Sequence, residues 1–107
     1  LQFQTRSFLY VEECIDGILR LMDSNYCDPI NIGSDEMIEI NELAKMIMKI
    51  AGKKQKIKHI SGPLGVRGRN SDNKLIKKVL NWAPKSPLKN GLKKTYQWIF
   101  DQVSKNI

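Results

Sequence analysis

Residues 7–22 read SFLYVEECIDGILRLM, and two periodic patterns follow one another in this stretch. Residues 7–11 form an apolar run rich in strand-forming side chains, which predicts a short strand. After this run the apolar side chains recur at helical spacing, which predicts a helix that ends near residue 22. Its apolar stripe consists of Val11, Ile15, Ile18, Leu19 and Met22. A strand followed by an amphipathic helix indicates a domain that mixes both kinds of element.

The rest of the chain continues this mixture. Residues 30–32 and 57–60 predict two more short strands, the second with Ile57 and His59 on one half-buried face. Apolar periodicity predicts three further helices, near residues 40–51, 73–81 and 87–103. The sequence therefore predicts an α+β fold, with about four helices and short strands, in a single small domain over residues 1–107.

Local signals refine the ends and faces of these helices. Gly52 is predicted to end the second helix. Ser86 is predicted to cap the last helix, with Pro87 at its first position. Gly91 inside that helix predicts close packing, because glycine costs about 1 kcal/mol there relative to alanine. The buried stripe predicted for the last helix is Leu88, Leu92, Thr95, Tyr96, Ile99 and Val103.

The 107 residues carry a net charge of +7, which is unevenly distributed. Residues 1–52 hold four basic and nine acidic side chains, whereas residues 53–107 hold fourteen basic and two acidic ones. The second half therefore has a net charge of +12. Such a half attracts anions, which include nucleotides, nucleic acid and acidic partners.

Residues 66–73 read VRGRNSDN and resemble an anion-binding loop. Arg67 and Arg69 flank Gly68, and a guanidinium group matches phosphate oxygens two at a time. A helix start is expected directly behind, with Asp72 or Ser71 as its cap, and helix N-termini favour anions. The pattern predicts a diphosphate site. The alternative is a solvated basic loop.

A second polar cluster, Gln4-Thr5-Arg6, precedes the first predicted strand. Its amide, hydroxyl and guanidinium groups can form hydrogen bonds with a sugar, a ribose or a phosphate. The alternative is a polar strand edge in which Arg6 pairs with Glu12 or Glu13.

No catalytic, cofactor or metal site is predicted. Residues 62–68 match G-x-x-G-x-x-G, but Pro63 interrupts the motif and no acidic residue follows about 20 positions later, so NAD binding by this loop is not expected. His59 has no serine or cysteine tied to it by a motif. Cys14 and Cys27 lack metal-type spacing, and free thiols favour a reducing compartment, here the cytoplasm.

Several of these stretches together resemble the C-terminal part of the GDP-mannose 3,5-epimerase family, which belongs to the extended short-chain dehydrogenases/reductases. The residues concerned are 4–8, 11–14, 29–37, 62–63, 65–73 and 82–84. The stretches QTRSF and VRGRNSDN are the more specific to that family, whereas the N-I-G and W-A-P stretches occur in many sugar-nucleotide epimerases and dehydratases.

The resemblance implies a substrate-binding domain whose parent enzyme binds NAD in an N-terminal Rossmann domain absent from this chain. The parent acts on GDP-mannose through a transient 4-keto intermediate and is commonly a homodimer. Gln4, Thr5 and Arg6 then contact the nucleotide-sugar, and Arg69 binds its diphosphate, with Arg67 as the alternative. The isolated chain is expected to be inactive and to bind no cofactor.

Three alternatives remain open. The chain could belong to an enzyme of the same class that acts on a UDP- or dTDP-sugar, or it could be a scaffold without a ligand. A nucleic-acid-binding module is less favoured, because the aromatic side chains do not alternate with the basic ones as a stacking platform requires. A membrane partner is not expected, since no run of about 18 apolar residues occurs.

Overall fold

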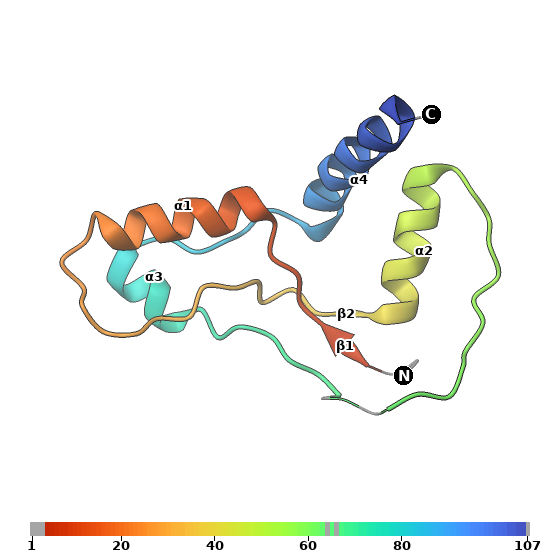
Figure 1. Ribbon diagram of the computed structural model, residues 1–107. Helices are drawn as coiled ribbons and strands as arrows, with labels where there is room; N and C mark the ends of the chain where they lie inside the picture. Colours follow the sequence, from red (N-terminus) through yellow and green to blue (C-terminus); the bar gives the residue numbers. More distant parts are fainter. Residues whose placement is uncertain (1–3, 64, 66, 107) are drawn as a thin grey trace.

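The computed structural model describes residues 4–63, 65 and 67–106. In this part of the chain it contains four helices and two short strands, which confirms the predicted α+β fold (Figure 1). The elements in chain order are β1 (Thr5–Arg6), α1 (Val11–Met22), β2 (Ile38–Glu39), α2 (Ile40–Ala51), α3 (Lys74–Leu80) and α4 (Leu88–Lys105).

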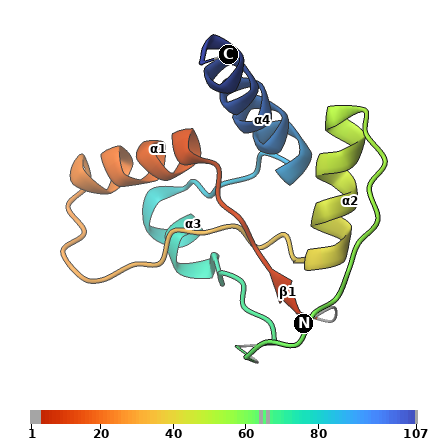
Figure 2. The same cartoon turned by 45° about the vertical axis from the view of Figure 1, so that its right-hand side comes forward.

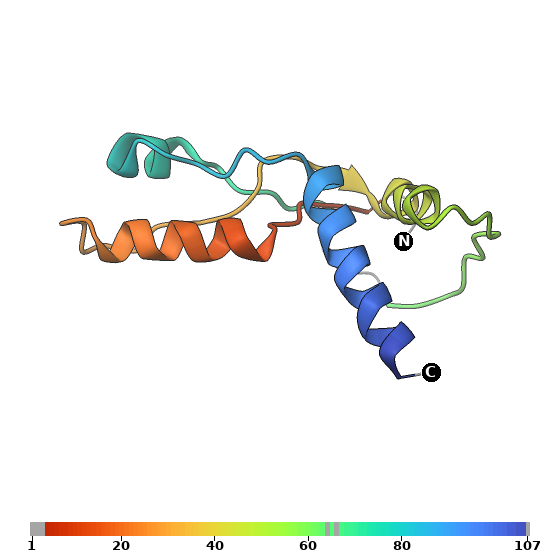
Figure 3. The same ribbon diagram turned by 90° about the horizontal axis from the view of Figure 1, so that it is seen from above.

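The two strands form a small antiparallel sheet. Thr5 pairs with Glu39, and Arg6 pairs with Ile38. The N–H of Ile40 donates to the carbonyl of Gln4 at 3.1 Å, so the pairing extends into the first residue of α2. Helices α1 and α3 lie at one end of the molecule and α2 at the other, while α4 projects from the middle and contacts α2 (Figures 1 and 3). The molecule is flat, with extents of 49 × 36 × 20 Å.

The strand predictions were largely wrong. Strand β1 occupies Thr5–Arg6, earlier than the predicted run at 7–11, and β2 was not predicted at all. Residues 30–32 and 57–60 form no strand, and Ile57 and His59 are exposed. Strand propensity is realised only where another strand supplies backbone partners and a surface to pack on. In the described residues that pairing exists only between β1 and β2.

The helix predictions were better. Helix α1 begins at Val11 and ends at Met22 as predicted, and α2 ends at Gly52, whose φ of +68° is the left-handed conformation that glycine adopts most readily. Helix α3, predicted near residues 73–81, covers Lys74–Leu80 and is ended by Asn81, whose φ is +50°. The N-cap of α3 is Asn73 and not the predicted Asp72 or Ser71, and it makes no side-chain capping bond. Asp72 Oδ1 nevertheless accepts from the N–H of Lys74, the first residue of the helix, at 3.0 Å.

The start of α4 differs from the prediction. Pro87 lies at the N-cap and the helix begins at Leu88, so Pro87 is not its first residue and Ser86 does not cap it. Instead, the N–H of Leu88 donates to Glu36 Oε1 at 2.9 Å. Glu13 Oε2 accepts from the N–H groups of Lys85 and Ser86, at 2.9 and 3.2 Å. Two carboxylates from distant segments therefore replace the local cap.

Buried apolar packing is sparse among the described residues. Ile76 on α3 is the large side chain that is fully buried. Two glycines are also buried at helix contacts: Gly17 of α1 lies against Ile32 and Trp82, and Gly91 of α4 lies against Tyr10. The contact at Gly91 confirms the close packing predicted there.

The predicted inner faces are partly uncovered. On α4, Ile99 and Val103 are 49% and 56% exposed and Thr95 is also exposed, so the predicted stripe is partly covered only at Leu88, Leu92 and Tyr96. The α1 stripe is exposed along its whole length. The apolar pattern was identified correctly, but no segment of the described chain covers the α1 stripe or the last part of the α4 stripe.

Replacing Gly91 with alanine should destabilise the protein by about 1–2 kcal/mol. The new Cβ would lie 2.9 Å from Tyr10 Cβ and 3.0 Å from its Cγ, too close for atoms near the backbone, and this overpacking outweighs the helix propensity gained. Urea unfolding measures the effect. The matched control is Asn90→Ala, an exposed neighbour that should be neutral or stabilising. A Gly91→Ala variant as stable as that control would contradict the packing argument.

Candidate functional site

The two polar clusters predicted from the sequence lie together in the structure. The backbone N–H of Thr5 in β1 donates to the carbonyl of Arg67 at 2.8 Å, and Thr5 Oγ1 lies 3.4 Å from the same oxygen. Figure 2 shows the segment that leads into α3 approaching β1. A residue of the QTR cluster therefore holds a residue of the arginine loop, which we define as residues 67–71.

Glycine at position 68 allows this close approach. A Cβ added to Gly68 would lie 2.7 Å from Thr5 Oγ1 and 3.2 Å from Met37 Cε. Position 65 is roomier, because a Cβ there would lie 3.7 Å from Arg6 Nη2 and 3.8 Å from Gln4 Nε2. All three side chains of the QTR cluster thus face the loop that carries the two arginines.

The arginines differ in their surroundings. Arg6 is half-buried, and its Nη1 donates to the Thr5 carbonyl at 2.7 Å. It does not form an ion pair with Glu12 or Glu13, so that pairing was wrong, although Thr5–Arg6 do form a short polar strand as the same alternative assumed. The side chains of Arg67 and Arg69 are exposed, and no carboxylate in the described part of the chain forms an ion pair with either. Their guanidinium groups can accept an anion as a bidentate partner.

The helix behind the loop contributes less than predicted. Helix α3 begins only at Lys74, and the first of its N–H groups is already bonded to Asp72. Any anion-binding capacity of this region therefore rests on the guanidinium groups and the loop backbone, not on a helix N-terminus.

Sequence reasoning did not include Met37 or Asn73 in the site. Met37 lies beside Gly68, and Asn73 is a buried amide bonded to the backbone at Gly33. The only signal for them was their position within the stretches 29–37 and 65–73, whose mutual contact the sequence does not reveal.

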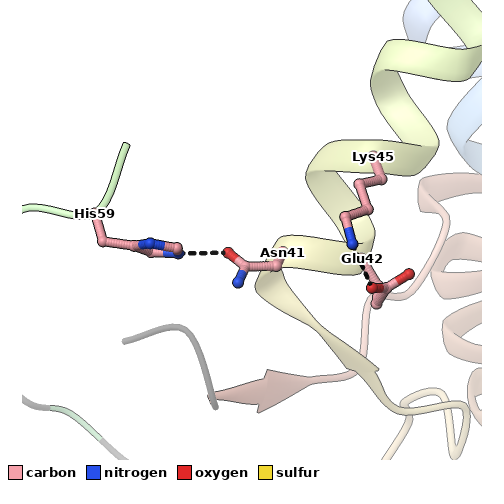
Figure 4. Close-up of polar contacts among 4 residues, drawn as sticks. All are labelled: Asn41, Glu42, Lys45 and His59. Atoms are coloured by element: carbon pink, nitrogen blue, oxygen red, sulfur yellow. Dashed lines mark hydrogen bonds and ion pairs between the residues drawn. The ribbon is translucent and has the colours of Figure 1, made fainter. Parts of the chain in front are cut away.

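The other candidate groups remain outside this site. His59 Nε2 contacts Asn41 Oδ1 at 3.2 Å at the start of α2, next to the ion pair between Lys45 and Glu42 at 3.1 Å (Figure 4). All four side chains are at the surface of the molecule or only partly covered, and no nucleophile accompanies the imidazole. The histidine is therefore a surface contact.

The described residues also lack the usual setting of a dinucleotide-binding turn. Neither described strand leads through a glycine turn into a helix, as such a site requires. The G-x-x-G-x-x-G stretch at residues 62–68 lies in a loop, although Leu64 and Val66 fall outside the described residues. Within the described ranges no cluster of three potential metal ligands occurs, and Cys14 and Cys27 are both free thiols. No described helix is long and apolar enough to cross a membrane.

Comparison with known proteins shows what the sequence and the fold resemble. No protein-family model matches the sequence. The chain is 56% identical to GDP-mannose 3,5-epimerase of Arabidopsis thaliana over 102 residues, which are 95% of this chain and 27% of that enzyme. It is 40% identical over 90 residues to UDP-glucuronic acid decarboxylase 3 of the same plant, covering 83% of this chain and 26% of that enzyme.

A solved structure shows the same fold. UDP-glucuronic acid 4-epimerase of Bacillus cereus, in complex with UDP-glucuronic acid and NAD, matches with a TM-score of 0.85 and 27% identity, over 94% of this chain and 33% of that one. The chain is therefore similar, in sequence and in fold, to the C-terminal part of enzymes in the extended short-chain dehydrogenase/reductase family. Within that family it is similar to the C-terminal part of GDP-mannose 3,5-epimerase, and it spans about a quarter of the length of the curated relatives it matches.

Replacing Gly68 with alanine should displace the arginine loop, whereas Gly65→Ala should not. The Cβ at position 68 forces Thr5 Oγ1 away from the Arg67 carbonyl, at a cost of about 1 kcal/mol, while position 65 has ordinary van der Waals space. Amide NMR shifts of Thr5 and Arg67 provide the measurement. Equal shifts in the two variants would show that the loop does not depend on this contact.

Proposed function

We propose that this chain is the substrate-binding part of an NAD-dependent epimerase that acts on GDP-mannose at C3 and C5 of the hexose. The observation that carries the proposal is the hydrogen bond between the Thr5 N–H and the Arg67 carbonyl. This bond joins the two stretches, QTR and RGR, that are the more specific to the GDP-mannose enzymes.

The residues of this junction take distinct roles. Arg69 binds the diphosphate with paired guanidinium hydrogen bonds, and Arg67 is the alternative for the same role. Gln4 and Arg6 contact the nucleotide-sugar through side-chain donors, and the Gln4 amide adds an acceptor. Thr5 contributes mainly by holding the loop, since its N–H and its hydroxyl both face the Arg67 carbonyl.

The chemistry itself requires a second domain. An N-terminal Rossmann domain would hold NAD, which would supply hydride-transfer chemistry at C4 of the hexose and so make the protons on C3 and C5 acidic. This chain's contribution is to hold the nucleotide-sugar in position for hydride transfer, which removes much of the entropic barrier to the reaction. The proposal includes a full-length homodimer and no NAD site in the chain by itself.

The apolar stripe on α1 is the surface that such a domain would cover. Its five side chains, between 45% and 74% exposed, form a continuous row along the helix. Soluble proteins seldom leave so large an apolar row unpartnered. The match covers only 27% of the GDP-mannose enzyme's length. The partner that we propose for this surface is the remaining part of an enzyme of this type.

One rival substrate class has a specific observation in its favour. The identity to a UDP-glucuronic acid decarboxylase supports a UDP-sugar ligand, although at 40% it is lower than the 56% to the GDP-mannose enzyme. Both ligands present a diphosphate to the same arginines. Competition between GDP-mannose and UDP-glucuronic acid would distinguish them.

Titration with GDP-mannose should shift the amide signals of residues 4–6 and of Arg67 and Arg69. We expect a Kd of about 1 mM, because a half-site leaves much of the ligand in water. Arg69→Ala should weaken binding at least about tenfold, as the loss of a charge-assisted pair predicts. The matched control is Arg20→Ala on α1, which should bind normally. A saturating titration without shifts at these residues would refute the proposed site.

The chain alone should convert no GDP-mannose in the presence of NAD. The described residues provide positioning groups but no acid–base pair tied to a hydride acceptor. A sensitive assay for epimerised product, with a complete enzyme of the family as the positive control, is the measurement. Turnover by the purified 107-residue chain would show that catalytic groups lie within it.

A further inference from the structure

Asn73 stands out because it is a polar side chain in a nearly inaccessible position. It is 5% exposed, and among the described residues it is the buried side chain that is polar. Burying an amide is costly unless its donors and acceptor find partners. Its partners therefore indicate what the residue does.

The amide of Asn73 joins two loops that are far apart in sequence. Its Nδ2 donates to the carbonyl of Gly33 at 3.0 Å, across 40 positions. Its Oδ1 accepts from Ser71 Oγ at 2.6 Å. An amide side chain supplies both a donor and an acceptor here, whereas a carboxylate lacks the donor and an aliphatic side chain lacks both.

The backbone reinforces the same junction. The N–H of Ser71 donates to the carbonyl of Ser34 at 3.2 Å. Gly33 and Ser71 are also in close contact, since a Cβ on Gly33 would lie 2.8 Å from Ser71 Cβ. We define residues 33–34 and 71–73 as the clasp.

Helix capping does not explain the position of the Asn73 side chain. Asn73 is the N-cap residue of α3, but its side chain makes no capping hydrogen bond. The first N–H of the helix, at Lys74, is bonded to Asp72 instead. The buried amide therefore serves the clasp and not the helix.

The clasp anchors one end of the arginine loop, and β1 anchors the other. Arg67 is held by Thr5 at 2.8 Å, and Ser71 is held by Ser34 and Asn73. Arg69 lies midway in this short span. Fixing both ends restricts the backbone conformations of the loop before any ligand arrives, which lowers the ordering cost of binding.

From this geometry we infer that Asn73 is a positioning residue, which orders the arginine loop in the ligand-free chain and thereby strengthens the binding of a nucleoside diphosphate-sugar through Arg69. The second half of this inference rests on the proposed function. Asn73 itself does not touch the ligand.

The first test is amide hydrogen exchange in the ligand-free chain. Asn73→Asp keeps the size of the side chain and the acceptor for Ser71 but replaces the donor to Gly33. We expect exchange at the Ser71 N–H to rise about tenfold, as an unpaired buried carbonyl predicts, with little change in α4. Ser71→Ala removes only the contact between Ser71 Oγ and Asn73 Oδ1, so it should raise the exchange rate less. This variant replaces Asn73→Asp in the test if Asn73→Asp folds poorly.

The matched control is Ile76→Val, which loosens the packing of α3 without touching the clasp. The inference is overturned if Asn73→Asp leaves exchange at Ser71 unchanged, or if Ile76→Val produces the same local pattern. This outcome does not depend on any ligand.

The second test is a double-mutant cycle measured as GDP-mannose affinity. Asn73→Asp should weaken binding about fivefold to tenfold in the wild-type background but have almost no effect when Arg69 is already alanine. Equal losses in both backgrounds would indicate a general structural role and would overturn the inference. If the wild-type chain does not bind GDP-mannose although Asn73→Asp loosens the loop, the proposed function fails while the ordering role of Asn73 stands.

Discussion

The rest of the candidate site depends on a single backbone hydrogen bond, from the Thr5 N–H to the Arg67 carbonyl. This bond connects the first described strand with a loop 62 positions later and determines which side chains share a surface. Gln4 and Arg6 face position 65, and Thr5 faces position 68. Without this contact the two polar clusters would be separate surface features, and neither alone is specific for a sugar-nucleotide.

The sequence predicted the helices well because their apolar periodicity is local information, as at α1 and α2. The strand predictions failed because a strand of two residues forms only where a distant segment comes close enough to pair with it. Nothing in the sequence near residues 57–60 reveals that this segment lacks such a partner. The prediction for the start of α4 was wrong for a similar reason. Ser86-Pro87 is a local capping signal, but Glu13 and Glu36 supply the acceptors from distant parts of the chain.

The candidate site shows the same difference between what the local sequence predicts and what only the fold reveals. Residue chemistry predicted that Arg67, Arg69 and the QTR cluster bind an anion or a sugar, but only the fold reveals that Thr5 and Arg67 adjoin. The helix expected behind the loop is present as α3, but its first N–H is bonded to Asp72 and is therefore not free for an anion. Asn73 was missed since its importance lies in burial and in a partner 40 positions away, neither of which a single sequence displays.

The contact between β1 and the arginine loop has a consequence for how such sites diverge. Its donor and acceptor are main-chain atoms, so a substitution at position 67 leaves the bond intact, and at position 5 only proline would abolish the donor. Side chains on this surface can therefore change while the main-chain frame that presents them stays fixed. Point mutations can thus alter the charge and hydrogen-bonding groups of the surface without rebuilding the domain.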